Sequence, residues 1–249
     1  MSTFKKKLKK TGRQIWELFK GSLPAMLMYC CAGSVIMMMT MNEEVFTWDN
    51  KKLMWTIGCI AVAIGYNLLI AYAQGGQGYE MLVSGNMKRH SQDAYGNAYK
   101  ISSHKEAKEY RVWKGFALGG FTALLTLICG IIFGVNGELI NGMYLGEQQS
   151  ANIGFEILMV VCVLLSGWSF LPIFFMNANG IAVSYYVSIL FGIIPIAITG
   201  GMYIVGAYAK RGKAIRAQEL ADREAAAQAE KPKKINYGGL PGTKPRKRK

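Results

Sequence analysis

The sequence, 249 residues long, is poor in the side chains that enzymes use for catalysis. It has two histidines, and its five cysteines form no CxxC pair, which argues against a zinc knuckle or a disulfide framework. Its long apolar runs contain no Asp, His, Lys or Arg, whereas proteolysis inside a membrane needs a basic partner for serine, paired aspartates or metal ligands there. We therefore predict a protein that is not an enzyme, with no catalytic, cofactor-binding or metal site.

Glycine-rich phosphate loops are missing as well. Gly75-Gly76-Gln77-Gly78 ends an apolar run and follows no strand, so we expect a helix C-terminus that unwinds at the membrane surface. The segment 238–244 shares only the composition of a Walker sequence, because its last Gly and its Lys are not adjacent. The methionines at 37, 38, 39 and 41 lack a defined cavity and are interpreted as packing or lipid-facing surface, not as a copper site.

What the sequence does have is hydrophobicity in long runs. Hydrophobic residues make up 51% of the chain, and charge-free runs span 21–42, 53–79, 115–137 and 157–209. A helix rises about 1.5 Å per residue, so about 20 residues cross a hydrocarbon core of about 30 Å. The first three runs each predict one membrane helix, and the fourth must turn back, with its best break at Asn177-Ala178-Asn179-Gly180. We therefore predict an all-α, polytopic integral membrane protein.

Lysine and arginine are concentrated in three segments. Of the 29 in the chain, residues 1–20 and 80–114 carry seven each, and 210–249 carries thirteen. Cytoplasmic loops of membrane proteins are enriched in these residues. We therefore place the N-terminus, the central loop and the C-terminal tail at the cytoplasmic face of what we expect to be the plasma membrane.

This orientation conflicts with two full crossings by 157–209, because two crossings would leave the tail outside. An odd number is needed, and one crossing plus a re-entrant or half-span segment fits the 53 residues of this run. We therefore favour about five membrane helices, with one of the last three incomplete. Five full crossings with an exterior tail are the alternative, because long tails can violate the rule.

The polar segments divide the chain into five regions. The first is patterned as an amphipathic helix that lies at the membrane interface, and Ser22 is expected to cap the next helix with Pro24 in its first turn. The last is expected to begin as a charged helix and to continue as a disordered tail. The regions are the interfacial helix 1–21, a membrane helical hairpin 22–79, a basic cytoplasmic loop 80–114, a membrane helical region 115–209, and the charged helix with its polybasic tail 210–249.

The central loop and the two ends are expected to contact anions. Tyr110, Arg111, Trp113 and Lys114 just before the third run are a typical interfacial anchor set, while His90 and His104 are interpreted as exposed. Anionic headgroups attract a basic tail by about 1 kcal/mol per residue near the surface, and contact with nucleic acid or the ribosome is the alternative. The residues expected to contact anionic lipid or a partner are Lys5, Lys6, Lys9, Lys10, Arg13, Arg246, Lys247, Arg248 and Lys249.

Small residues at helical spacing predict where helices pack closely. Such residues let two backbones approach, which drives helix association in a membrane. The spacing leaves open whether the partner is another helix of the same chain or another subunit. The predicted packing residues are Gly58, Ala61 and Gly65 in the second run and Gly115, Gly119, Ala123, Gly130 and Gly134 in the third.

The leading functional hypothesis is a non-enzymatic membrane protein that acts by association, as a complex subunit, scaffold or accessory protein. It would bind itself or a membrane-protein partner and present a polybasic cytoplasmic face. The alternative is a small-solute transporter or channel, whose polar path would run beside a last helix broken near Pro195. The residues of that path would be Asn67, Asn177, Asn179 and Thr199. A membrane enzyme would need a bound cofactor that the sequence does not reveal.

Overall fold

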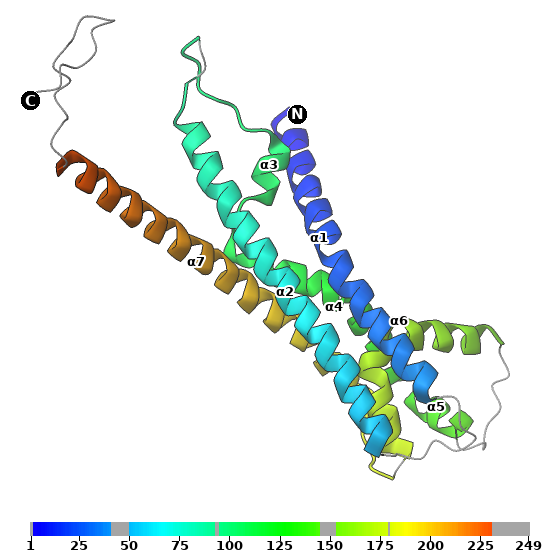
Figure 1. Ribbon diagram of the computed structural model, residues 1–249. Coiled ribbons are helices and arrows are strands. Elements are labelled where there is room, and N and C mark those ends of the chain that lie inside the picture. The colour runs from blue at the N-terminus through cyan, green and yellow to red at the C-terminus, as the bar shows by residue number, and fades with distance from the viewer. Residues whose placement is uncertain (1, 41–49, 93–94, 145–152, 179, 231–249) are drawn as a thin grey trace, which may run out of the picture. The chain divides into compact units, whose positions relative to one another are not determined.

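The computed structural model describes residues 2–40, 50–92, 95–144, 153–178 and 180–230. Every regular element in these ranges is a helix, which confirms the all-α prediction (Figure 1). Five of the helices, α1, α2, α4, α6 and α7, contain stretches long and apolar enough to cross a membrane. The elements are α1 (Ser2–Thr40), α2 (Asn50–Arg89), α3 (Ser103–Lys108), α4 (Val112–Val135), α5 (Gly137–Tyr144), α6 (Ile153–Ala178) and α7 (Val187–Glu230).

The chain divides into two compact units, 1–210 and 211–249. The first unit contains α1 to α6 and the membrane part of α7. In the second unit, the described residues 211–230 continue as helix with exposed side chains, as expected for the charged helix after Lys210. The predicted disordered tail lies outside the described residues.

Two predicted helix ends are wrong. Helix α1 continues through Ser22, whose hydroxyl donates a hydrogen bond to the carbonyl of Phe19 (2.8 Å) inside the helix and so caps nothing. Helix α2 likewise continues through Gly75-Gly76-Gln77-Gly78 to Arg89 instead of unwinding there. The glycines stay helical because another helix packs directly against them, as described below.

Contacts between the helices fix their directions. Gln74 of α2 donates to the carbonyl of Gly21 in α1 (2.7 Å), and Asn67 donates to Tyr29 (3.3 Å), so α1 and α2 are antiparallel. Along α4 and α7, the contacts pair Gly130 with Ile189, Gly119 with Ile196 and Gly115 with Tyr203, so these two are also antiparallel. We call the end of the bundle that contains Gly21, Gln74, Gly115 and Tyr203 the basic end.

Helix α7 runs parallel to α2. Thr199 donates to Asn67 (3.1 Å), and Lys210 pairs with Glu80 (2.6 Å). Residue numbers therefore rise together along both helices toward the basic end. It follows that Lys210 lies at the same end of the first unit as the charged half of α1.

Helix α6 consists of two halves joined at Ser166, whose backbone angles are not helical (φ −138°, ψ 19°). Figure 1 shows that the half 153–165 projects sideways from the bundle, whereas the half 167–178 lies along it. The first half exposes most of its apolar side chains, including Ile153 (75% exposed) and Ile157 (60%). The second half is packed inside the bundle, with Trp168 completely buried.

The second half of α6 runs away from the basic end. Trp168 donates to Thr126 of α4 (3.1 Å), and two residues later Phe170 stacks on Phe133 at 3.9 Å between ring centroids. Residue numbers thus rise together along α4 and this half, so both point the same way. Near Ser166, the Leu165 carbonyl accepts from Cys30 (3.3 Å), halfway along the charge-free part of α1.

The break between α6 and α7 falls where the sequence predicts it. Helix α6 ends at Ala178, and Gly180 has φ +78°, a conformation that glycine adopts without steric cost. The Asn177 side chain closes the turn by donating to the carbonyl of Val183 (2.9 Å) and accepting from its N–H (2.6 Å). These two hydrogen bonds from one side chain to the backbone explain why asparagine suits the position.

Candidate functional site

The central loop is held against the basic end by ion pairs with α1. Lys10 of α1 contacts Glu106 of α3 (2.6 Å), and Glu17 of α1 contacts His104 (3.1 Å) and Lys108 (3.8 Å). The hydrogen bond from Lys10 lowers the pKa of Glu106 below its ordinary value. Helix α3 is therefore a docked element, and His104, interpreted from sequence as an exposed histidine, is more than half exposed but faces a carboxylate.

The residues that follow α3 join the loop to α2 and α7. Arg89 of α2 donates to both carboxylate oxygens of the buried Glu109 (2.7 and 2.8 Å), and glycine at position 85 leaves room for that carboxylate. The N–H of Tyr110 donates to the carbonyl of Gly78 (2.9 Å). Its ring stacks on Tyr203 of α7 at 5.3 Å, and burial raises the pKa of Tyr110.

Lys114 is the most unusual residue of this end. Its side chain is buried (2% exposed), and its ammonium group donates to the carbonyls of Ala107 (2.5 Å) and Glu109 (2.7 Å). The sequence predicts an interfacial anchor here, but the lysine instead turns inward and binds carbonyls at the C-terminal end of α3. A cation at that position interacts favourably with the helix dipole.

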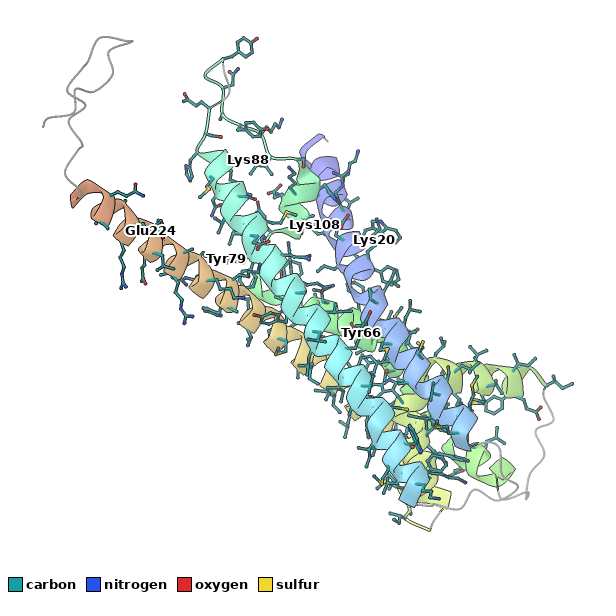
Figure 2. All side chains as sticks on the ribbon, viewed as in Figure 1. Lys20, Tyr66, Tyr79, Lys88, Lys108 and Glu224 are labelled. Carbon is teal, nitrogen blue, oxygen red and sulfur yellow. The ribbon has the colours of Figure 1, made fainter. Side chains whose placement is uncertain are left out.

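A cavity of about 440 Å³ opens between these elements. Its polar lining includes three lysines, Lys20, Lys108 and Lys114, and one carboxylate, Glu17. Figure 2 shows Lys20 on α1 and Lys108 on α3, near the same end of the bundle. The apolar part of the lining includes Leu18, Met81, Leu118 and Tyr203.

The predicted packing face of α4 lies against α7. A Cβ atom on Gly119 would lie 2.6 Å from the Cα of Ile196, and one on Gly115 would lie 2.8 Å from the Cβ of Tyr203. Gly130 meets Ile189 and Gly134 meets the ring of Tyr186 in the same way, and Ala123 is completely buried. Only residues this small allow the two helices to come so close.

The predicted face of α2 has no close neighbour in the part of the chain that the structure describes. A Cβ atom on Gly58 or Gly65 would have no neighbour within 4 Å, and Ala61 is exposed. Helix α2 instead packs through glycines that the sequence analysis assigned to a helix end. A Cβ on Gly75 would overlap the carbonyl oxygen of Tyr203, and a Cβ on Gly206 would overlap that of Tyr72. The glycines at 75–78 were therefore the signal for this helix crossing, although the sequence pattern predicted a helix end there.

Two of the four residues of the predicted polar path, Asn67 and Thr199, come together, and Asn177 lies apart from them. Asn67, Thr199 and Tyr29 form a buried hydrogen-bonded trio between α1, α2 and α7. Asn177 is occupied by the turn at Val183, before the start of α7 at Val187. Thr199 lies twelve residues farther along α7, which is about 18 Å of helix. Asn179 lies outside the described residues. In the part of the chain that is described, no buried side-chain nitrogen or oxygen lacks a hydrogen-bond partner.

The predicted basic contact residues are only partly described. Lys9, Lys10 and Arg13 are exposed on α1, and Lys10 is engaged by Glu106. Lys5 and Lys6 lie within α1, but their side chains are outside the described part of the structure. The four basic residues of the tail, Arg246, Lys247, Arg248 and Lys249, are outside the described residues altogether.

The basic end gathers positively charged side chains around a cavity. Among the described residues, no group of three or more His, Cys, Asp or Glu side chains is placed to hold a metal ion. Lys114 and its neighbours form a basic wall beside an apolar one. The chain matches no protein-family model, no curated protein and no solved structure.

Proposed function

We propose that this protein crosses the membrane four times, with α6 as a re-entrant element, and acts by association rather than by catalysis. The crossings would be α1, α2, α4 and the membrane part of α7. The observation that carries the proposal is the set of helix directions: α4 and the second half of α6 both point away from the basic end, and only α7 returns. One crossing after α4 brings Lys210 back to the side of the N-terminus.

This topology satisfies the charge distribution. It puts residues 1–20, 80–114 and 210–249 on one side, and with them 27 of the 29 lysines and arginines. That side is the cytoplasmic face by the positive-inside rule, and we expect the membrane to be the plasma membrane. Five full crossings would leave thirteen basic residues on the opposite side.

The break in α6 has the properties of a re-entrant element. Its second half has 12 residues, about 18 Å of helix, which is too short to cross a hydrocarbon core of about 30 Å. Irregular backbone at membrane depth is tolerated where protein buries it, and Ser166 is completely buried. Ser169 donates to the carbonyl of Ser166 (2.9 Å), which satisfies an acceptor near the break. The apolar first half would face lipid.

Topology mapping tests the proposal. Tyr95→Cys and Leu240→Cys would be placed one at a time in a chain whose five cysteines are replaced by serine. Both positions are expected to react with a membrane-impermeant maleimide only when the cytoplasmic face is accessible. Labelling from opposite sides would establish an odd number of crossings between residues 95 and 240, whereas the re-entrant assignment requires two.

The association part of the proposal rests on surfaces that the chain leaves uncovered. Among the described residues, nothing lies within 4 Å of a Cβ placed on Gly58 or Gly65, and Ala61 is exposed. This small-residue face of α2 would be available to a second copy or to another membrane protein. Native mass measurement in mild detergent tests this. The Gly58→Leu/Gly65→Leu variant is expected to lose the larger species, with Tyr66→Leu, about 100° around the helix from Gly65, as the control. A wild-type monomer that copurifies with nothing would count against association.

A small-solute transporter is the second candidate. The last helix, α7, continues through Pro195 and does not break there as predicted, so the broken helix is α6. This break and the polar trio of Tyr29, Asn67 and Thr199 favour the transporter. Asn67→Ala should then abolish solute flux into proteoliposomes while the protein stays folded. Asn177→Ala, which affects a turn, serves as the comparison. Unchanged flux in Asn67→Ala would remove the trio from any transport path.

A further inference from the structure

We propose that the cavity at the basic end binds the headgroup phosphate of an anionic phospholipid. The inference deepens the proposed function, since it requires the basic end to lie at the level of the lipid headgroups. Three features of the cavity support it: a buried ammonium group that makes no direct ion pair, an excess of positive charge, and an apolar wall at the depth of the cytoplasmic limits of the charge-free runs.

The ammonium group of Lys114 is held ready for an anion. It carries three N–H donors, of which two bind the carbonyls of Ala107 and Glu109. No carboxylate among the described residues forms an ion pair with it, because Glu109 is occupied by Arg89 and Glu106 by Lys10. Burying an ammonium group is costly, and the two carboxylates nearest to Lys114 already form direct ion pairs with Lys10 and Arg89. A phosphate oxygen in the cavity would supply both a direct ion pair and the third acceptor.

The cavity carries more positive than negative charge. Lys20, Lys108 and Lys114 face one carboxylate, Glu17, which leaves a net charge of +2 when His104 is neutral. Glu17 is closest to His104 (3.1 Å), whereas Lys108 lies at 3.8 Å, the longest ion pair of this end. The ammonium group of Lys108 therefore keeps donors for a second anion.

The position of the cavity favours a lipid over a free phosphate ester. Its lining includes Gly21, Gly78 and Lys114, which lie at or next to the cytoplasmic limits of the first three charge-free runs. An anion bound there would sit at the level where headgroups meet hydrocarbon. The buried Leu18 and Leu118 provide an apolar wall that a glycerol backbone and the start of an acyl chain can cover. The volume of about 440 Å³ is within the range of small-molecule sites.

Binding of a labelled phosphatidylglycerol to the full-length protein in phosphatidylcholine nanodiscs tests the inference. The cavity variant is Lys20→Gln/Lys108→Gln, and the matched control is Lys88→Gln/Lys100→Gln, which removes the same charge from the same end outside the lining. Each basic residue near a headgroup contributes about fivefold in affinity, so the cavity variant should bind about 30-fold more weakly. The control should change binding less than about threefold, since its lysines are solvated and screened. Lys114→Met, assayed after a thermal melt shows it folded, should lose binding at least as strongly.

Three results would overturn the inference. Equal losses in the cavity variant and the control would mean that lipid is attracted by the whole basic surface. No loss in either would remove lipid from this end. Displacement of the labelled lipid by soluble glycerol 3-phosphate, at concentrations near the dissociation constant of that ester, would identify a free phosphate ester as the ligand. The readout is independent of topology: labelling of residues 95 and 240 from opposite sides would refute the crossings proposed above without changing these affinities.

Discussion

The small-residue faces of α4 and α2 share one pattern and have opposite fates. On α4, Gly115 and Gly119 touch α7 so closely that a single added methyl group would have no room. On α2, Gly58 and Gly65 have open space where that methyl group would go. Helix α2 meets α7 farther along, at Gly75, which follows no predicted face. Small residues therefore indicate that a close approach is available, but not that the chain itself uses it.

The two sets of small residues differ because a helix packs against its neighbours with only some of its faces. Helix α2 already buries Ala63, Asn67 and Ala71 against its neighbours. Gly58 and Gly65 fall outside this line, since successive residues are rotated by about 100° around the helix axis. The face that they form is left to lipid or to another subunit.

The largest effect is expected at the α2–α7 crossing. Gly75→Ala places a methyl group on the carbonyl oxygen of Tyr203, a backbone atom that cannot rotate away, so the helices must separate. We expect a loss of about 3 kcal/mol in the free energy of unfolding, measured by thermal or denaturant unfolding in mild detergent. A Gly75→Ala protein as stable as the wild type would mean that this crossing is looser than the structure has it.

The buried polar trio gives the next largest effect. Asn67→Ala leaves the hydroxyls of Tyr29 and Thr199 without their shared partner. Hydrogen bonds between membrane helices contribute about 0.6 kcal/mol on average, so losing two should cost about 1 kcal/mol. A double-mutant cycle with Thr199→Val measures the coupling, and additivity of the two changes would show that this bond stabilises nothing.

The uncovered face of α2 predicts a change of opposite sign. Gly58→Ala and Gly65→Ala add a methyl group in open space and remove the entropic cost of glycine in a helix. Each is expected to leave the monomer unchanged or to stabilise it by about 0.5 kcal/mol, in the same unfolding assay as Gly75→Ala. Destabilisation of the monomer by either change would place a neighbour against this face.

The smallest effect concerns the docking of α3 and depends on pH. The pKa of Glu106 is lowered in the folded protein by Lys10, so the stabilisation is present above the ordinary glutamate pKa of about 4.3. It is lost as the pH falls from that value through the lowered one. Because both side chains are partly exposed, the change should be small and should weaken with salt. Proteolysis of the loop between pH 6 and pH 3 would report it, with Glu106→Gln insensitive to pH over this step.

The fold was predictable wherever composition limits the choices. Charge-free runs of the length of a bilayer gave the helices, and the Asn-Gly pattern at 177–180 gave the turn before α7. The helix boundaries at Ser22 and at Gly75-Gly76-Gln77-Gly78 were mispredicted because Ser22 resembles a helix start and the glycines resemble a helix end, and packing overrides both local signals. At the basic end, Lys114 was assigned to the interface because no spacing rule indicates that the end of α3 will fold back over it.

The sequence by itself determined that the protein is helical and apolar in stretches long enough for a membrane, because few other structures satisfy the backbone of such runs in lipid. It also determined where the positive charge lies along the chain. Only the tertiary structure decided which small residues meet, which way the second half of α6 points, and that a buried lysine faces a cavity. Those features depend on contacts between residues far apart in the chain. Hydrophobicity and helix propensity are properties of single segments and do not determine which segments meet.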